Sequence, residues 1–222
     1  MSAGDLATCI LAAADAVEAS RDELGRLDAV AGDGDHGLTM THGARAVRKA
    51  IEQDSGAPAA DMLGKVAAAM GSVGGAIGPI YAMALLKMAG VVRASQGADS
   101  ALTVGQLRAC ADAAVTAVAH LGHAKPGDKT ILDALVPVAE SLRASEEDGS
   151  AVDVALVRAS EAARAGAENT AGMIASVGRA ARLGEQSRGT ADAGATSFAV
   201  IVAAAVGSYL ANGPAPRRGG AQ

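Results

Sequence analysis

The residues best suited to chemistry are three aspartates that stand close together in a glycine-rich stretch. Asp28, Asp33 and Asp35 fall within eight residues and are followed by His36. Like charges this close repel one another unless a cation neutralises them, and oxygen ligands select a hard cation such as Mg²⁺ or Ca²⁺. An EF-hand is excluded because Ala44 stands where that loop requires a glutamate. The stretch predicts a magnesium site completed by phosphate and water; the alternative is a plain Asp-Gly turn before a helix.

Three further glycine-rich segments, 71–79, 122–130 and 183–197, have the composition of loops that approach a ligand closely. The first precedes a predicted helix, so its N–H groups either bind an anion or simply permit tight helix packing. The second resembles a P-loop, but Asp128 separates its last glycine from Lys129. Asp128, and likewise Asp192 in the third segment, either serves the site or caps the helix that follows. Together the segments supply the parts that phosphoryl transfer needs.

The elements that position these segments are predicted to be helices. Half of the 222 residues are hydrophobic and only three are aromatic, so alanine and aliphatic side chains must fill the core. Apolar residues recur at helical spacing in eight segments. These lie at about 6–17, 40–51, 59–71, 78–93, 104–118, 131–142, 151–171 and 195–211. The sequence therefore predicts an all-α domain over residues 1–212, followed by a disordered Gly-, Pro- and Arg-rich tail over 213–222.

The charge and the termini exclude several classes of protein. A net charge of −5 and the scarcity of stacking aromatics argue against a nucleic-acid partner. Cys9 and Cys110 lack metal-ligand spacing and are interpreted as buried thiols. Asp5 precedes any apolar run, which is untypical of a signal peptide. Gly or charge interrupts the apolar stretches well before the length of a membrane span, so we expect a cytoplasmic protein without a membrane partner.

Four motifs, at 27–37, 72–79, 126–134 and 183–197, resemble DhaL, the nucleotide-binding subunit of dihydroxyacetone kinases, which also forms the C-terminal domain of single-chain ketose kinases. The match runs in order from about residue 5 to 211. It implies a single-domain antiparallel eight-helix barrel with ADP or ATP bound at one end. It also implies a phosphotransferase with an alcohol acceptor, namely a keto-sugar that a separate DhaK-like subunit holds covalently.

The resemblance also assigns residues to the expected site. Asp28, Asp33 and Asp35 would bind two Mg²⁺ ions and, with Arg179, act in catalysis. The expected nucleotide contacts are His36, Gly37, Leu38, Thr39, Ala76, Ile77, Gly122, Ile131, Arg179, Asp192, Ala193 and Gly194. The phosphoryl donor is either exchangeable ATP or tightly held ADP that a DhaM-like phosphocarrier recharges. A homodimer is a further alternative for the assembly.

The sequence departs from the family pattern in three places, two of them single residues and one a short segment. Ile77 replaces a small, usually hydroxylated residue near the phosphates, Thr39 replaces a common Asn, and Thr190-Ala191-Asp192-Ala193-Gly194 replaces His-Gln-Asp-Pro-Gly. The predicted metal ligands are unaffected. Two alternatives to a kinase subunit therefore stay open: a regulatory relative that binds nucleotide without transfer, and a helical barrel that binds an apolar ligand.

Overall fold

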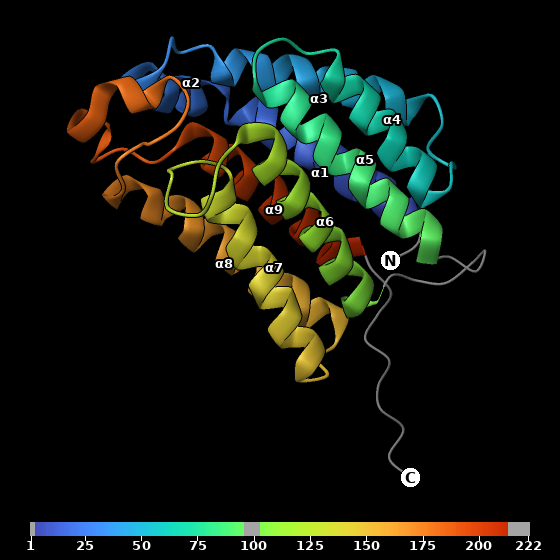
Figure 1. The fold of residues 1–222 in the computed structure, drawn as a ribbon. Coiled ribbons are helices and arrows are strands. Elements are labelled where there is room, and N and C mark those ends of the chain that lie inside the picture. The colour runs from blue at the N-terminus through green and yellow to red at the C-terminus, as the bar shows by residue number, and fades with distance from the viewer. Residues whose placement is uncertain (1–2, 96–102, 213–222) are drawn as a thin grey trace.

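The computed structural model describes residues 3–95 and 103–212, and within them it contains nine α-helices and two 3₁₀-helices (Figure 1). The α-helices are α1 (Ala3–Ala19), α2 (Arg21–Ala31), α3 (His36–Glu52), α4 (Ala59–Gly71), α5 (Ile77–Ser95), α6 (Val104–Gly122), α7 (Leu132–Glu147), α8 (Val152–Asn169) and α9 (Ala193–Asn212). The 3₁₀-helices η1 (Thr170–Gly172) and η2 (Ala180–Ser187) lie between α8 and α9. The all-α prediction is confirmed. The predicted tail, 213–222, lies outside the described residues.

Eight of the helices form a closed ring. Contacts run from α1 to α3 and then along the chain through α4, α5, α6, α7, α8 and α9, which packs against α1. The end of α1, the start of α3, the end of α4 and the start of α5 all lie at one rim, and this alternation continues to the start of α9. Neighbouring helices are therefore antiparallel, as expected for an eight-helix barrel, and one rim gathers four inter-helix loops.

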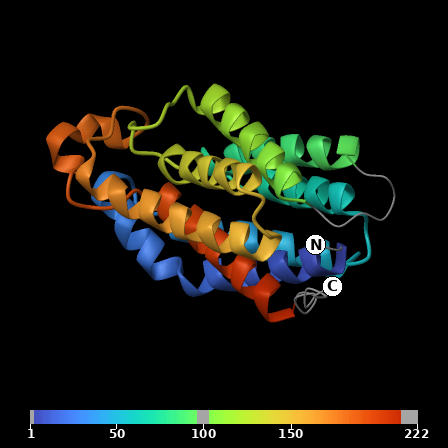
Figure 2. The same ribbon diagram turned by 90° about the horizontal axis from the view of Figure 1, so that it is seen from below.

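The helix α2 lies outside the ring, at the rim that carries these loops. It contacts α3, α9 and η2, and Figures 1 and 2 both show it beside η2 at the same end of the bundle. Apolar spacing does not predict α2, because its sequence is polar on average and Leu24 is its only buried residue. Its packing against neighbouring elements, rather than an apolar stripe, accounts for this helix.

Small side chains fill the space between the ring helices. The largest core cluster combines α6, α7, α8 and α9, and four of its alanines, Ala134, Ala155, Ala163 and Ala195, are completely buried. Alanine allows helix axes to approach closely, so the ring closes with few aromatic residues. Cys9 and Cys110 are both buried and free, as predicted.

Two ring helices, α5 and α9, are long and apolar enough to cross a membrane by length and composition. In α9, Gly194 and Gly207 interrupt the apolar run, as expected, although its 20 residues contain no charged side chain. Length and composition are weak evidence for a span, because ring helices that pack against neighbours on both sides have the same composition.

Candidate functional site

The loops at one rim of the barrel surround a pocket of 570 Å³. Its walls come from the end of α2, the starts of α3, α5 and α9, the end of α6, the loop before α7 and the segment between α8 and α9. Val118, Leu121 and Ile80 make part of the lining apolar, whereas Asp28 and Asp35 make another part acidic. A pocket of this size, with a large apolar lining and few polar groups, is typical of small-ligand sites.

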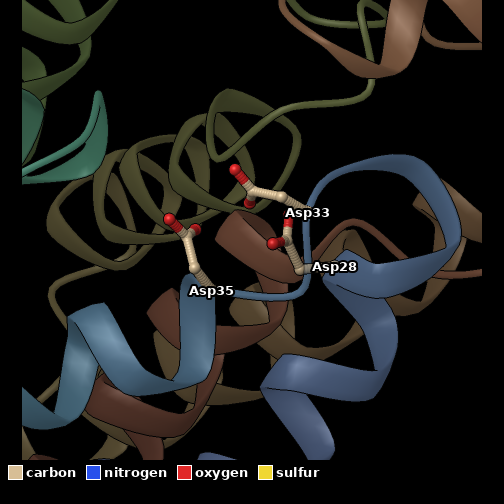
Figure 3. Close-up of side chains that lie close together, drawn as sticks. All are labelled: Asp28, Asp33 and Asp35. Carbon is tan, nitrogen blue, oxygen red and sulfur yellow. The ribbon is translucent and has the colours of Figure 1, made fainter.

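The acidic loop, residues 28–35, brings the three predicted metal ligands together. Asp28 lies in the last turn of α2, Asp33 in the connection, and Asp35 directly before α3. One oxygen atom from each carboxylate lies within 4.8 Å of the others, and Figure 3 shows the three side chains gathered at the same point. Three oxygen donors on a short, accessible loop match the ligand set of Mg²⁺, which keeps waters and phosphate oxygens in its shell.

Backbone N–H groups and close backbone contacts fix the shape of this loop, with the Asp28 carboxylate as one acceptor. Gly32 N–H donates to Asp28 O at 2.5 Å where α2 ends, and His36 N–H donates to the Asp28 carboxylate at 3.3 Å where α3 begins. A Cβ atom on Gly37 would collide with the carbonyl oxygen of Arg21 and would lie 2.8 Å from Gly25 N. Glycine at position 37 therefore lets the start of α3 rest directly on the backbone of α2.

Arg179 reaches the acidic loop from the segment between α8 and α9. Its guanidinium group pairs with the Asp33 carboxylate and lies 3.5 Å from Asp35. All three side chains are about half exposed, so water screens this contact and its net contribution to stability is small. The arrangement shows that the crowded carboxylates accept a cationic partner at this position.

His36 links the acidic loop to the start of α9. Its Nε2 atom lies 3.0 Å from Ser197 Oγ, and the Ser197 hydroxyl donates to Gly194 O at 3.0 Å. Burial lowers the pKa of His36, which outweighs the opposing effect of Asp28 and Asp35. A neutral imidazole is thus favoured, which suits a positioning role between two walls of the pocket.

The turn before α5 contributes backbone groups to the same pocket as the acidic loop. Gly75, Ala76 and Ile77 line the pocket, and α5 begins at Ile77. The first N–H groups of an α-helix lack intrahelical partners and carry partial positive charge, so this end of α5 favours an anion. The Ile77 side chain packs against a core cluster, so an apolar residue has apolar neighbours here.

The loop between α6 and α7 contradicts one expectation. Asp128 does not cap α7: its carboxylate accepts from Lys125 N–H at 2.8 Å and from the Ser176 hydroxyl at 2.6 Å. These hydrogen bonds lower the pKa of Asp128 to about 2. Asp133 instead accepts from Gly127 N–H at 2.5 Å and from Thr130 N–H at 2.7 Å, and so fixes the turn that enters α7.

Asp192 caps α9, as the alternative interpretation of its segment predicts. Its carboxylate accepts from Ala195 N–H at 2.8 Å while its carbonyl accepts from Thr196 N–H at 2.9 Å. The residue also lines the pocket. Burial raises its pKa to about 6, and the nearby Asp133 adds to this effect. Asp192 is thus a helix cap and a pocket residue at once.

The structure brings most of the predicted site residues to this pocket. Those that line it are Asp28, Asp35, His36, Thr39, Ala76, Ile77, Gly122, Ile131, Arg179, Asp192, Ala193 and Gly194. Asp33 belongs to the acidic cluster beside it. Gly37 and Leu38 are not among the lining residues: Gly37 is buried against α2, and Leu38 is half exposed. The individual roles of all these residues stay predictions.

Sequence reasoning missed several residues that shape the pocket. Leu27, Val30, Pro79, Ile80, Val118 and Leu121 line its apolar part. They occupy ordinary helical positions, and nothing in their spacing separates them from core residues. Ser187 and Thr190 also line the pocket, and both accept hydrogen bonds from Lys129 through their carbonyl groups. A contact made through a carbonyl group leaves no trace in residue type.

Comparisons with known proteins agree with this architecture. A family model described as DAK2 domain matches residues 30–207. The chain is 39% identical over 172 residues to the ADP-binding subunit DhaL of the PEP-dependent dihydroxyacetone kinase of Escherichia coli, covering 77% of this chain and 80% of that protein. It is also 39% identical over 200 residues to the L-erythrulose kinase of Pectobacterium atrosepticum, covering 89% of this chain. The chain spans about a third (33%) of the length of that kinase.

The fold has a solved counterpart. The dihydroxyacetone kinase of C. freundii, in a crystal structure with AMP-PNP and Mg²⁺, matches with a TM-score of 0.69 at 24% sequence identity. The match covers 91% of this chain and 33% of that one. At this identity the likeness establishes the helical fold.

Proposed function

The chain belongs to the DAK2-domain family, and on this premise we propose that it is the magnesium-dependent nucleotide-binding part of a ketose kinase. The single observation that carries the proposal is the acidic cluster at the pocket. Asp28, Asp33 and Asp35 offer oxygen atoms within 4.8 Å of one another, at a pocket that the start of α5 also lines. A cation site and a helix N-terminus in one pocket of this size suit a nucleoside di- or triphosphate.

The carboxylates would hold two Mg²⁺ ions. When bound, these ions neutralise phosphate charge and hold the terminal phosphoryl group in place. Groups of the chain itself bind the rest of the nucleotide. The N–H groups at the start of α5 bind phosphate oxygens, and the apolar wall formed by Ile80, Val118 and Leu121 covers the base and excludes water. Arg179 pairs with Asp33 and lies beside Asp35 in the ligand-free chain, and it would be free to contact a phosphate oxygen if Mg²⁺ bound these carboxylates.

The acceptor is a hydroxyl group of a keto-sugar that a separate DhaK-like subunit holds covalently across the mouth of the barrel. The relatives support this assignment, since one is named as a dihydroxyacetone kinase subunit and another as an erythrulose kinase. The reaction is phosphoryl transfer to an alcohol group, and the protein acts in the cytoplasm. Tightly held ADP recharged by a DhaM-like phosphocarrier, and exchangeable ATP, are both compatible with this site.

The proposal is tested by isothermal titration calorimetry with ADP in the presence of Mg²⁺ and in the presence of a chelator. We expect Asp33→Asn to weaken Mg²⁺-dependent ADP binding by at least about tenfold, because one oxygen ligand becomes a weaker neutral donor. The helical circular dichroism signal should stay unchanged, because Asp33 is exposed and caps no helix. Asp22→Asn, at an exposed aspartate of α2 that pairs only with its neighbour Arg21 in the described residues, is the matched control. Equal affinities of wild type and Asp33→Asn would refute the metal site.

A further inference from the structure

Lys129 is a buried cation that the site described above does not use. Only 5% of its surface is exposed. Its ammonium group donates to the carbonyl oxygens of Ser187 at 2.6 Å, Thr190 at 2.7 Å and Thr170 at 2.9 Å, with Met173 O at 3.3 Å. We call these four carbonyl groups the Lys129 cage. In the part of the chain that the structure describes, no carboxylate forms an ion pair with this lysine.

The backbone of Lys129, whose side chain enters the cage, is strained. Its φ angle is +62°, in the left-handed region that a residue with a Cβ atom seldom adopts. Such a conformation persists only where the surrounding contacts hold it in place. An ammonium group has three N–H donors, and the three shortest contacts use all of them. Lys129 is therefore not available to hold a phosphate as the lysine of a P-loop does.

The cage joins the two ends of one segment, residues 170–192, which we call the strap. Thr170 and Met173 belong to its beginning and Ser187 and Thr190 to its end. The two ends also bond to each other, because Gly189 N–H donates to Ala171 O at 2.8 Å. A buried ammonium group surrounded by carbonyl dipoles is strongly held, and leaving those carbonyls without partners would be costly.

The strap delivers two groups to the pocket. Arg179, near the middle of the strap, pairs with the Asp33 carboxylate and lies 3.5 Å from that of Asp35. Asp192, at its end, donates its N–H to Thr170 Oγ1 at 2.8 Å and caps α9. Asp128, the neighbour of Lys129, holds the strap through Ser176. The pair Asp128–Lys129 thus fastens the strap at its middle and at both of its ends.

We propose that Lys129 is a positioning residue: its ammonium group closes the strap over the pocket and thereby sets Arg179 and Asp192 in place for the nucleotide. The four carbonyl groups of the cage surround a positive charge, and that charge is the ammonium group of Lys129 itself. The role in nucleotide binding rests on the proposed function. The closure of the strap does not depend on the proposed function, and it can be measured on the chain without ligand.

The test compares Lys129→Met, which removes the charge at similar length, with Lys87→Met at an exposed lysine of α5. Trypsin cleavage after Arg182 and Arg188, followed by mass spectrometry, reports opening of the strap. We expect Lys129→Met to accelerate this cleavage at least about tenfold while Lys87→Met leaves it unchanged. Cleavage at the wild-type rate in a folded Lys129→Met chain would overturn the proposal.

The affinity for Mg²⁺ and ADP separates positioning from a general structural role. Lys129→Met and Arg179→Ala should each weaken binding, and the double variant should lose little more than the larger single loss, because Lys129 acts partly through Arg179. Losses that multiply would show that Lys129 does not position Arg179 and would overturn this step. If the wild-type chain binds no nucleotide, the proposed function fails, whereas the cleavage rates still decide whether Lys129 closes the strap.

Chemical rescue covers the case in which Lys129→Met does not fold. Lys129→Ala lacks three carbon atoms and the ammonium group, which n-propylammonium supplies. We expect n-propylammonium, and not n-propanol, to restore slow cleavage of the strap in Lys129→Ala. Equal effects of the two compounds, or no effect of either, would contradict a cation-specific cage.

Discussion

In the acidic loop, the side chains of Asp33 and Asp35 keep 52% and 55% of their surface exposed, whereas Lys129, on another wall of the same pocket, keeps 5%. The carboxylates have half-exposed Arg179 as their cationic partner, while Lys129 has its full set of buried carbonyl acceptors. The charges that must meet a ligand are left accessible and incompletely neutralised. The charge that holds the walls in place is buried and saturated with hydrogen bonds.

The two regions differ in what stabilises their charged groups. Three adjacent carboxylates repel one another, and cations from solution relieve that repulsion. A buried ammonium group loses its hydration, and the protein's own carbonyl groups replace the lost water. A variant in the acidic loop should therefore change ligand binding and leave the fold intact. A variant among the residues that pack against the acidic loop or the Lys129 cage should change the free energy of unfolding.

The largest expected effect comes from the support beneath the acidic loop. Gly37→Ala places a Cβ atom against the carbonyl oxygen of Arg21, where only movement of the backbone can make room. We expect a loss of about 3 kcal/mol in the free energy of unfolding, measured by urea denaturation. Gly64→Ala, inside α4 and with nothing within 4 Å of the added atom, should instead stabilise by about 0.5–1 kcal/mol. Equal effects at the two positions would contradict the close approach of α2 and α3.

A smaller effect is expected beside the Lys129 cage, from the protonation of Asp192. Its pKa of about 6 lies above the ordinary 3.8, so the protonated form favours the folded chain. The associated stability is fully present below about pH 4 and is lost as the pH rises through 6. Asp192→Asn keeps the cap and removes the titration.

The stability of the ligand-free chain should therefore fall between pH 4 and 6 in wild type and fall less in Asp192→Asn. Urea denaturation at a series of pH values, without metal or nucleotide, measures both curves. Parallel curves would show that Asp192 does not titrate in this range and that its carboxylate is better solvated than its burial indicates.

The sequence contains enough information to predict the ring but not the strap. Apolar spacing locates α1 and α3 to α9, because each of these helices presents a repeating apolar face to its neighbours. It does not locate α2, which buries only Leu24. The three aspartates are predictable as a cluster because they are neighbours in the chain and carry charge.

The contacts that join distant segments are beyond such reasoning. Lys129 bonds to carbonyl groups 41 to 61 residues further along the chain, and every residue type offers a carbonyl group. Asp128 is ambiguous for a related reason: a carboxylate before a helix commonly caps it, but here Ser176 competes for it from the strap. Tertiary contacts, rather than local preference, decide both cases.

We propose that the acidic loop binds divalent cations together with the nucleotide. Electron paramagnetic resonance of Mn²⁺ tests it most directly, because Mn²⁺ accepts the same oxygen ligands as Mg²⁺ and its free signal can be counted. We expect about two Mn²⁺ ions to bind per wild-type chain when ADP is present, and fewer in Asp33→Asn. The same number of bound ions in wild type and Asp33→Asn, or none in wild type, would contradict the account.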